Sequence, residues 1–439
     1  MILTCDAGLI DGLCVDRPAV RIIDGAIAAV APSDQLPATA GEERLDLGRR
    51  ALLPGTVNTH NHSFQSLLRG FGDDLPFLEW RDRALYRYSP EITRPGVDGV
   101  YTGALFAFAE MALHGVTTVC DFFYLNNGAN ENASRVIQAA RDVGLRVVLA
   151  RCFYDWEGAP ASYRESPIDA ARRFHELRCA HAADPLVTVQ PAPHSLHGAS
   201  PAMIHAGVEC AREVGTRWHI HLAEEKYQVE EARRNFGTTP LRAVQQLGLL
   251  GPDMIAVHGC WFDEGERALL AQSGAALAYN PGSNMFLGDG VTDIVDLDRR
   301  GVRIALGTDG GCSNSRVSVL DEMRSCALLQ KVARLDGQAL TAERAFHFGT
   351  VGGGDALGLP IGSLSVGQRA DLLFVDLDDP SLWPEQSLPK NVVYSLSARA
   401  IKEVFVDGKP VVRDGRLVNV ELAAVKARVC ELTQSWRRE

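Results

Sequence analysis

Eight short apolar runs alternate with longer amphipathic segments between residues 50 and 310, and this alternation constrains the fold more than any other feature of the chain. The runs span residues 51–59, 116–124, 146–154, 186–192, 217–222, 254–259, 275–280 and 302–307. The segments between them have helical periodicity, as in residues 133–144, 264–273 and 321–334. Strands alternating with helices in this way predict an α/β fold, a distorted (β/α)8 TIM-like barrel. A doubly wound sheet is less favoured, because no Gly-x-Gly-x-x-Gly motif follows any run.

The two chain ends have a different pattern. Residues 1–50 and 358–420 contain short strand-like runs separated by turn signals such as Asp24-Gly25, Asp407-Gly408 and Asp414-Gly415. Neither end alone is long enough for a stable core, so together they are expected to form a flanking β-sandwich. The predicted domains are therefore a composite sandwich (1–53 and 356–420), a catalytic barrel (54–355) and a C-terminal helix (421–439).

Composition narrows the class of partner. The chain has 439 residues and a formal net charge of -11, which argues against nucleic acid or an anionic membrane as a partner. No apolar run approaches the roughly 20 residues needed to span a bilayer, and the N-terminus lacks a basic-then-apolar leader. The ten cysteines include no Cys-x-x-Cys pair, which favours reduced thiols. We expect a cytoplasmic protein with a small-molecule substrate, either monomeric or a homodimer or higher homo-oligomer.

Histidine and aspartate stand at the ends of several predicted strands. Residues i and i+2 of a strand share a face, so His60 and His62 aim two imidazoles at one point. His221, His258 and Asp309 end three later runs. The carboxyl ends of barrel strands meet on one face, and a set of imidazoles with a carboxylate suits Zn²⁺ with open positions. The pattern predicts a metal centre there.

The distribution of lysine bears on the number of metal ions. A two-metal site in such a barrel commonly needs a bridging carboxylated lysine on a middle strand, but residues 1–225 contain no lysine. A single divalent ion is therefore expected. Zinc is the first expectation, with Fe²⁺ or another transition metal as alternatives.

Three segments carry a resemblance to a known family. Residues 54–62 end in His60-Asn61-His62, residues 219–224 read His-Ile-His-Leu-Ala-Glu, and residues 307–310 read Gly-Thr-Asp-Gly. These segments, with the tail at 362–372, resemble the amidohydrolase superfamily, and most closely its cytosine deaminase and triazine hydrolase group. The match covers nearly the whole chain. It implies that the metal ligands are His60, His62, His221 and Asp309. The resemblance implies that His221, and not His219, is the metal ligand, because the family's His-x-x-Glu motif falls on His221 and Glu224.

The resemblance also implies catalytic roles for Glu224, His258 and Asp309. A bound metal lowers the pKa of water from 15.7 towards about 7, which supplies a hydroxide nucleophile. Asp309 would accept a proton, Glu224 would protonate the attacked nitrogen and then the departing ammonia, and His258 would polarise the attacked group. The implied activity is hydrolysis of a non-peptide C–N bond in an amidine-like group, with release of ammonia.

Two alternative reactions stay open at this point. One is chloro- or alkylamino-hydrolysis of an s-triazine, and the other is deamination of a purine or pterin ring. Loss of chloride needs less protonation of the leaving group, so an intact Glu224 favours deamination. A metal-free scaffold protein on the same fold is disfavoured, because the ligands and Glu224 are all present.

Substrate contacts rest on a more local resemblance, to formiminoglutamate deiminase. It implies that the pocket is lined by Gln65, Arg81, Tyr124, His194 and His197. Arg81 is the natural clamp for a carboxylate, because guanidinium matches its geometry bidentately. Two departures indicate another substrate: His197 stands where the deiminase would carry an arginine, and Gly310-Gly311-Cys312 follows Asp309. The same chemistry on a different substrate is therefore expected.

Overall fold

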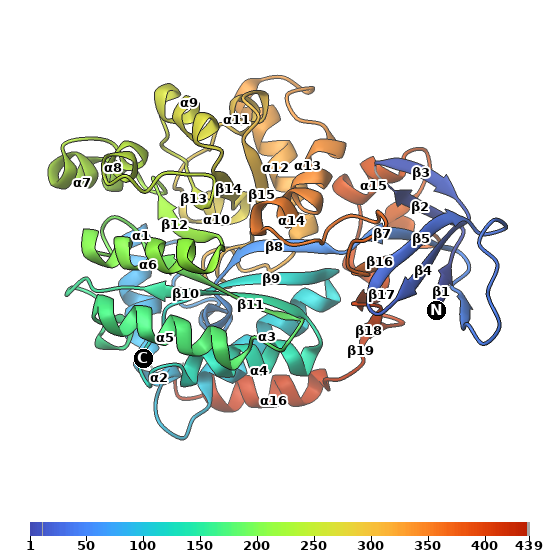
Figure 1. Ribbon diagram of the computed structural model, residues 1–439, viewed down its shortest axis with the longest axis horizontal. Coiled ribbons are helices and arrows are strands. Elements are labelled where there is room, and N and C mark those ends of the chain that lie inside the picture. The colour runs from blue at the N-terminus through green and yellow to red at the C-terminus, as the bar shows by residue number, and fades with distance from the viewer. Residues whose placement is uncertain (11, 437–439) are drawn as a thin grey trace.

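Eight parallel strands form the centre of the molecule in the computed structural model, which describes residues 1–10 and 12–436 (Figure 1). They are β8 (Thr56–Asn61), β9 (Val116–Phe123), β10 (Arg146–Phe153), β11 (Val187–Pro193), β12 (Trp218–Leu222), β13 (Met254–His258), β14 (Ala276–Tyr279) and β15 (Arg303–Leu306). They lie in two four-stranded sheets, β8-β9-β10-β11 and β12-β13-β14-β15. Backbone hydrogen bonds join the sheets at both edges, from Thr308 to His60 (3.1 Å) and from His221 to His194 (3.0 Å). The predicted distorted (β/α)8 barrel is confirmed.

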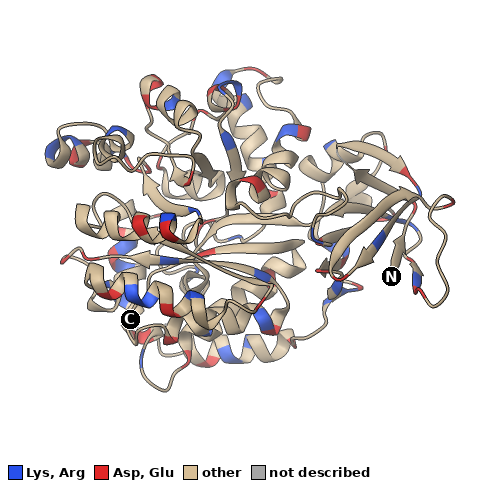
Figure 2. Ribbon diagram, viewed as in Figure 1, with Lys and Arg blue, Asp and Glu red and all other residues tan. Residues whose placement is uncertain are grey.

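Helices cover the outside of the barrel. They are α3 (Gly99–Leu113), α4 (Glu131–Val143), α5 (Pro167–Ala180), α6 (Pro201–Val214), α7 (Lys226–Phe236), α8 (Pro240–Gln246), α9 (Glu264–Ser273), α10 (Pro281–Leu287), α11 (Ile294–Arg299), α12 (Val319–Arg334), α13 (Ala342–Phe348) and α14 (Val351–Leu357). Charged side chains lie mostly on these helices and on loops, and the barrel strands are nearly free of them (Figure 2). The strands can be so apolar because both of their faces are buried.

The connection from β8 to α3 is long and contains four short elements. These are η1 (Ser63–Leu68), α1 (Phe77–Trp80), the π-helical turn η2 (Arg81–Tyr86) and α2 (Arg87–Ile92). Trp80 anchors this segment, since its indole N–H donates to the Cys312 carbonyl at 2.8 Å and its side chain is buried. The segment thereby lies over the carboxyl ends of the strands.

Both chain ends build the flanking sandwich. One sheet has the order β5 (Ala26–Pro32), β4 (Pro18–Ile23), β1 (Ile2–Thr4), β6 (Arg44–Asp46). The other has the order β19 (Arg416–Leu417), β18 (Lys409–Arg413), β17 (Ile401–Val406), β16 (Leu372–Asp376), β7 (Arg50–Pro54), β2 (Ala7–Ile10), β3 (Leu13–Asp16). In the second sheet β7 pairs antiparallel with β16, which joins the two ends of the chain. Leu3, Leu52 and Phe374 pack between the sheets. The predicted flanking sandwich from both ends is confirmed.

The apolar run at residues 51–59 was predicted as one strand, although the predicted domain boundary at residues 53/54 lies inside it. The structure has two strands here. The run divides at Gly55 into β7 of the sandwich and β8 of the barrel. The Gly55 N–H donates to the Asp371 carbonyl and the Thr56 N–H donates to the Gly115 carbonyl, so the hydrogen-bond partner changes between adjacent residues. A Cβ at Gly55 would lie 2.3 Å from the Thr117 side chain, so only glycine fits at this crossing.

The remaining described elements are η3 (Ala161–Tyr163), η4 (Pro380–Leu382), α15 (Leu388–Tyr394), η5 (Ala398–Ala400) and α16 (Leu422–Thr433). The helix predicted at 421–439 corresponds to α16, which packs against α3, and residues 437–439 lie outside the described residues. Within residues 1–10 and 12–436, no helix combines the length and apolar character needed to cross a bilayer. All ten cysteines are free thiols.

Candidate active site

Three imidazoles and a carboxylate converge at the carboxyl ends of the barrel strands. His60 lies in β8 and His62 follows it, His221 lies in β12, and Asp309 follows β15. The Nε2 atoms of His60 and His221 are 3.2 Å apart. Asp309 Oδ1 lies 3.5 Å from His60 Nε2 and 3.2 Å from His62 Nε2. All four side chains are buried.

The spacing and tautomers of this group fit a metal ion. A tetrahedral ion with metal–nitrogen bonds of about 2.0–2.1 Å has ligand atoms about 3.3 Å apart, close to these distances. His62 Nδ1 lies 2.6 Å from the Phe122 carbonyl and His221 Nδ1 lies 2.8 Å from the His194 carbonyl. Each Nδ1 must donate to its carbonyl, which leaves Nε2 with a free lone pair. Burial, and then the charge of His60, lowers the pKa of His62 to about 4, so this imidazole is neutral as a ligand must be.

Asp309 is held as a carboxylate with one oxygen free for the histidines. Ser283 Oγ and Ser313 Oγ donate to Oδ2 at 2.6 and 3.0 Å. Burial raises the pKa of Asp309, but the hydrogen bond with His60 and the nearby imidazoles bring it well below its usual value. Oδ1 therefore faces the histidine nitrogens as a charged acceptor.

Glu224 and His258 form a second group beside the first. Glu224 Oε1 lies 3.5 Å from His258 Nε2, and the ligand atoms of Glu224, His258 and Asp309 are within 4.8 Å of one another. Burial, and then the charge of Asp309, raises the pKa of Glu224 well above its usual value. Glu224 can therefore hold a proton at neutral pH, as a general acid requires.

The strand ends that carry these groups share an uncommon backbone conformation. Ala223, His258 and Asp309 have φ angles of 49°, 72° and 57°, in the left-handed region that non-glycine residues rarely adopt. Such residues cost about 1–3 kcal/mol each and cluster at functional sites. His258 and Asp309 line the reaction cavity, as does Glu224, which directly follows Ala223.

All predicted substrate-contacting residues line one cavity with the groups just described. They are Gln65, Arg81, Tyr124, His194 and His197. Gln65 Nε2 donates to the Tyr124 hydroxyl at 2.7 Å, and His194 Nδ1 lies 2.9 Å from Ser195 Oγ.

Arg81 is partly engaged by the protein itself. Its Nε donates to Asp82 Oδ1 at 2.8 Å, and its guanidinium carbon lies 4.8 Å from the centre of the Tyr86 ring. Its side chain is 23% exposed. Burial, and then the charge of Arg81, lowers the pKa of His197 to about 4, so His197 is neutral. The cavity therefore has one cationic and one neutral side chain near each other on its wall.

Aromatic side chains that the sequence did not identify form much of the cavity wall. They are Phe77, Trp80, Tyr86, Tyr154, Tyr163 and Tyr227. Phe77, Trp80 and Tyr86 lie in one ten-residue segment, but the three other tyrosines come from separate parts of the chain, so no single sequence signal could have grouped all six. Planar rings on several sides suit a flat, conjugated substrate.

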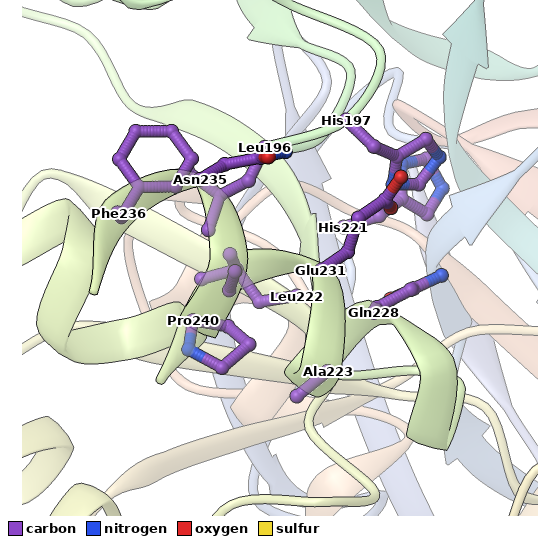
Figure 3. A pocket seen from close by; sticks show the side chains of 11 residues that line it. Leu196, His197, His221, Leu222, Ala223, Gln228, Glu231, Asn235, Phe236 and Pro240 are labelled. Atoms are coloured by element: carbon purple, nitrogen blue, oxygen red, sulfur yellow. The ribbon is translucent and has the colours of Figure 1, made fainter. Parts of the chain in front are cut away.

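Two nearby features do not belong to the reaction cavity. His219 Nε2 lies 2.7 Å from Gln190 Oε1, and His219 is outside the metal-binding group. A smaller cavity on the α7 side of His221 is lined in part by Leu222, Gln228 and Phe236 (Figure 3). Its volume is about 10 Å³ against about 70 Å³ for the reaction cavity, so it holds little more than one water.

Comparison with known proteins identifies the family. The Amidohydrolase family model matches residues 51–411. The 5-methylthioadenosine/S-adenosylhomocysteine deaminase of Syntrophobacter fumaroxidans is 36% identical over 433 residues, which cover 98% of this chain and 95% of that protein. The 5'-deoxyadenosine deaminase of Methanothermobacter thermautotrophicus is 33% identical over 440 residues, which cover 98% of this chain and 99% of that protein.

Solved structures agree with this assignment. A zinc-bound adenosine deaminase from Xanthomonas campestris superposes with a TM-score of 0.92 at 28% identity, covering 100% of this chain and 98% of that one. A zinc complex of atrazine chlorohydrolase from Arthrobacter aurescens has a TM-score of 0.92 at 22% identity, covering 98% and 99%, and supports the fold alone. The predicted family and the enzyme class are confirmed. The chain belongs to the amidohydrolase family, and it is a metal-dependent hydrolytic deaminase.

Proposed function

We propose that this enzyme hydrolyses the exocyclic amino group of a planar nitrogen heterocycle, with an adenine-type ring as the first candidate. The observation that carries the proposal is the placement of Glu224 and His258 against the histidine–aspartate group in a cavity with aromatic walls. Relatives named as deaminases of adenine nucleosides support the choice of ring.

One divalent metal ion, zinc first, would be held by His60, His62, His221 and Asp309. The ligand spacing and the free Nε2 lone pairs support this assignment, as does zinc in two solved relatives. When bound, such an ion acts as a Lewis acid that makes water a nucleophile at neutral pH.

The protein residues would manage the protons of the reaction. The attacking water loses a proton, and Asp309 is placed to accept it. Glu224 would protonate the ring nitrogen next to the attacked carbon, then take the remaining proton of the added hydroxyl and deliver it to the departing amine. The proton accepted by Asp309 would then pass to Glu224, which restores both carboxyl groups. A C–O bond forms, the exocyclic C–N bond breaks, and ammonia leaves as the carbonyl product is released. His258 would hydrogen-bond the group under attack.

The discriminating experiment is an ammonia-release screen with zinc-loaded enzyme. The panel contains adenosine, 5'-deoxyadenosine, 5'-methylthioadenosine, aminopurine and aminopterin bases, formimino and guanidino acids, and atrazine. Ammonia from a purine or pterin substrate is the expected result. Ammonia from the acyclic acids alone, or chloride from atrazine alone, would overturn the proposal.

Arg81 is proposed to bind a polar or anionic group of the substrate. Arg81→Met should then raise KM sharply and lower kcat much less, because it removes binding made equally in the ground and transition states. The metal content should be unchanged. Arg83→Met is the matched control, since Arg83 lies on the same turn, pairs with Glu79 and is 62% exposed. An unchanged kcat/KM in Arg81→Met would contradict the assignment.

A further inference from the structure

Two asparagine amides face the same nitrogen of His258. The Asn284 Nδ2 lies 2.9 Å and the Asn280 Nδ2 lies 3.3 Å from His258 Nδ1. An amide nitrogen only donates, so Nδ1 must accept, and in a neutral imidazole the proton then resides on Nε2. A doubly protonated imidazolium would point a second N–H at these donors, so the contacts at Nδ1 require the neutral ring.

The orientation of the Asn284 amide is itself set by a second contact. Its Nδ2 also donates to Asp289 Oδ2 at 2.9 Å. The turn that brings them together follows α10, where the Asp289 N–H donates to the Asn284 carbonyl at 3.0 Å. Both side chains are 1% exposed, so water does not compete for these hydrogen bonds. One amide group thus donates both of its protons, one to Asp289 and one to His258.

Asp289 acts in this arrangement as an uncharged acceptor. Burial raises the pKa of Asp289 to about 10, so the group carries a proton at neutral pH. Oδ2 remains available to the Asn284 amide. An asparagine at position 289 would offer the same acceptor and the same donor, whereas a leucine would offer neither.

We propose that Asn284 and Asp289 are positioning residues that hold His258 as the Nε2–H tautomer, with that N–H directed into the reaction cavity. His258 lines the cavity, and its buried Nε2 makes no hydrogen bond within the protein, although Glu224 Oε1 lies 3.5 Å away. A substrate atom is the natural acceptor. What the N–H does to that atom rests on the proposed function, but the tautomer itself does not.

The tautomer of His258 determines which residues in the cavity can donate a hydrogen bond and which can accept a proton. A histidine with its proton on Nε2 donates a hydrogen bond into the cavity and has no lone pair there to accept a proton from water. Proton acceptance is left to Asp309 and Glu224. Loss of the positioning contacts lets the Asn284 amide rotate and present its oxygen to Nδ1, which favours the opposite tautomer.

The test is the tautomer of His258 in zinc-loaded enzyme labelled with ¹⁵N-histidine, read from long-range ¹H–¹⁵N correlations. The wild type and Asp289→Asn should show the Nε2–H form. Asn284→Leu and Asp289→Leu should populate the Nδ1–H form and lower kcat by about 10–100-fold, as loss of an outer contact typically does, with KM little changed. His219, held by Gln190, is the internal control whose signal should not move.

An Nδ1–H tautomer in the wild type, or an unchanged tautomer in both leucine variants, would overturn the inference. If Asn284→Leu does not fold, the comparison of Asp289→Leu with Asp289→Asn still decides it. A wild type with the expected tautomer and no deaminase activity would refute the proposed function and leave the positioning role intact.

Discussion

Glu224 and Asp309 are two buried carboxyl groups in one cavity whose pKa values are displaced in opposite directions. Opposite displacement of this kind separates an acid from a charged ligand or base in one site. The cause is visible at each residue. Asp309 accepts hydrogen bonds from two serine hydroxyls and faces the histidines, whereas Glu224 is approached by Gln228 and by the charge of Asp309.

Replacing Glu224 with glutamine tests whether it transfers protons or binds metal. Glu224→Gln should retain zinc and lower kcat by about 10²–10⁴-fold or more, because general acid–base catalysis contributes that much for one transfer. His62→Ala is the contrasting variant and should lose zinc together with activity. Metal content by elemental analysis and kcat by ammonia release are the measurements. Loss of zinc from Glu224→Gln would make this residue a ligand.

A third buried carboxyl group, Glu322 in α12, should make stability depend on pH. Burial raises its pKa to about 8 from 4.5, although it accepts from the Gly282 N–H at 2.7 Å and from Asn314. Below pH 4.5 the group is protonated in both states. Between 4.5 and 8 only the unfolded chain releases the proton, so stability falls by about 1.4 kcal/mol per pH unit as pH rises.

Glu322→Gln removes this titration and should flatten the profile. Urea unfolding at pH 5.5 and 7.5 should show the wild type losing roughly 3 kcal/mol relative to the variant between the two conditions. The same difference between the two proteins at both pH values would mean that Glu322 titrates normally.

At the scale of elements, β8 and β15, the first and last of the eight barrel strands, lie in contact. This contact brings His60 of β8 close to Asp309, which follows β15. Gly307 lies at this contact, and a Cβ there would lie 2.4 Å from Asn280 Oδ1 and 2.8 Å from the His60 backbone nitrogen. The backbone of β8 cannot move away without moving His60. The spacing of His60 and Asp309 therefore depends on the absence of a side chain at this position.

Gly307→Ala should destabilise the protein by about 1–3 kcal/mol, the usual cost of overpacking, and should weaken zinc binding. Chemical unfolding and zinc titration are the measurements. Gly337→Ala is the matched control, because a Cβ at Gly337 meets no atom within 4 Å. Equal effects of the two substitutions would show that the β8–β15 contact tolerates a methyl group.

The strands and the strand-end residues could be predicted from apolar runs in the sequence, whereas contacts between separate segments could not. Largely apolar runs at residues 116–124 and 254–259 correspond closely to β9 and β13, and the polar residues at the ends of such runs located His258 and the other strand-end groups. The predicted domain boundary at residues 53/54 lies next to Gly55, but the break into two strands was missed because an apolar run does not reveal a change of hydrogen-bond partner. Asn284 and the aromatic wall were missed for a related reason, since their roles arise only when separate loops meet.

At the scale of the whole molecule, an ion cluster ties the barrel to the sandwich. Arg146 begins β10, and its Nε and Nη2 each lie 3.3 Å from an oxygen of Asp371, just before β16. It also pairs with Asp407 in the turn after β17. Burial raises the pKa of Asp371, and the charge of Arg146 lowers it. The buried carboxylate therefore depends on Arg146 to stay charged.

Arg146→Met should destabilise the protein by about 3–5 kcal/mol, because it leaves a buried carboxylate without its partner. Thermal and chemical unfolding measure the loss. Arg172→Met is the surface control, since Arg172 pairs with Glu176 on an exposed helix face, and it should leave stability unchanged within error. A negligible effect of Arg146→Met would mean that the sandwich and the barrel are held together by apolar packing alone.

The pairing of β7 with β16 imposes an order on how the chain can fold during synthesis. Pro54 at the end of β7 meets Leu372, about 320 residues later in the chain. At about 5–20 residues per second, a ribosome would take roughly 15–60 s to cover that interval. Throughout this interval the apolar strand β7 has one edge without its partner, immediately beside the first strand of the barrel. The sheet that contains β7 can therefore be completed only when nearly the whole chain has been made, and until then this edge of β7 needs protection from other strands.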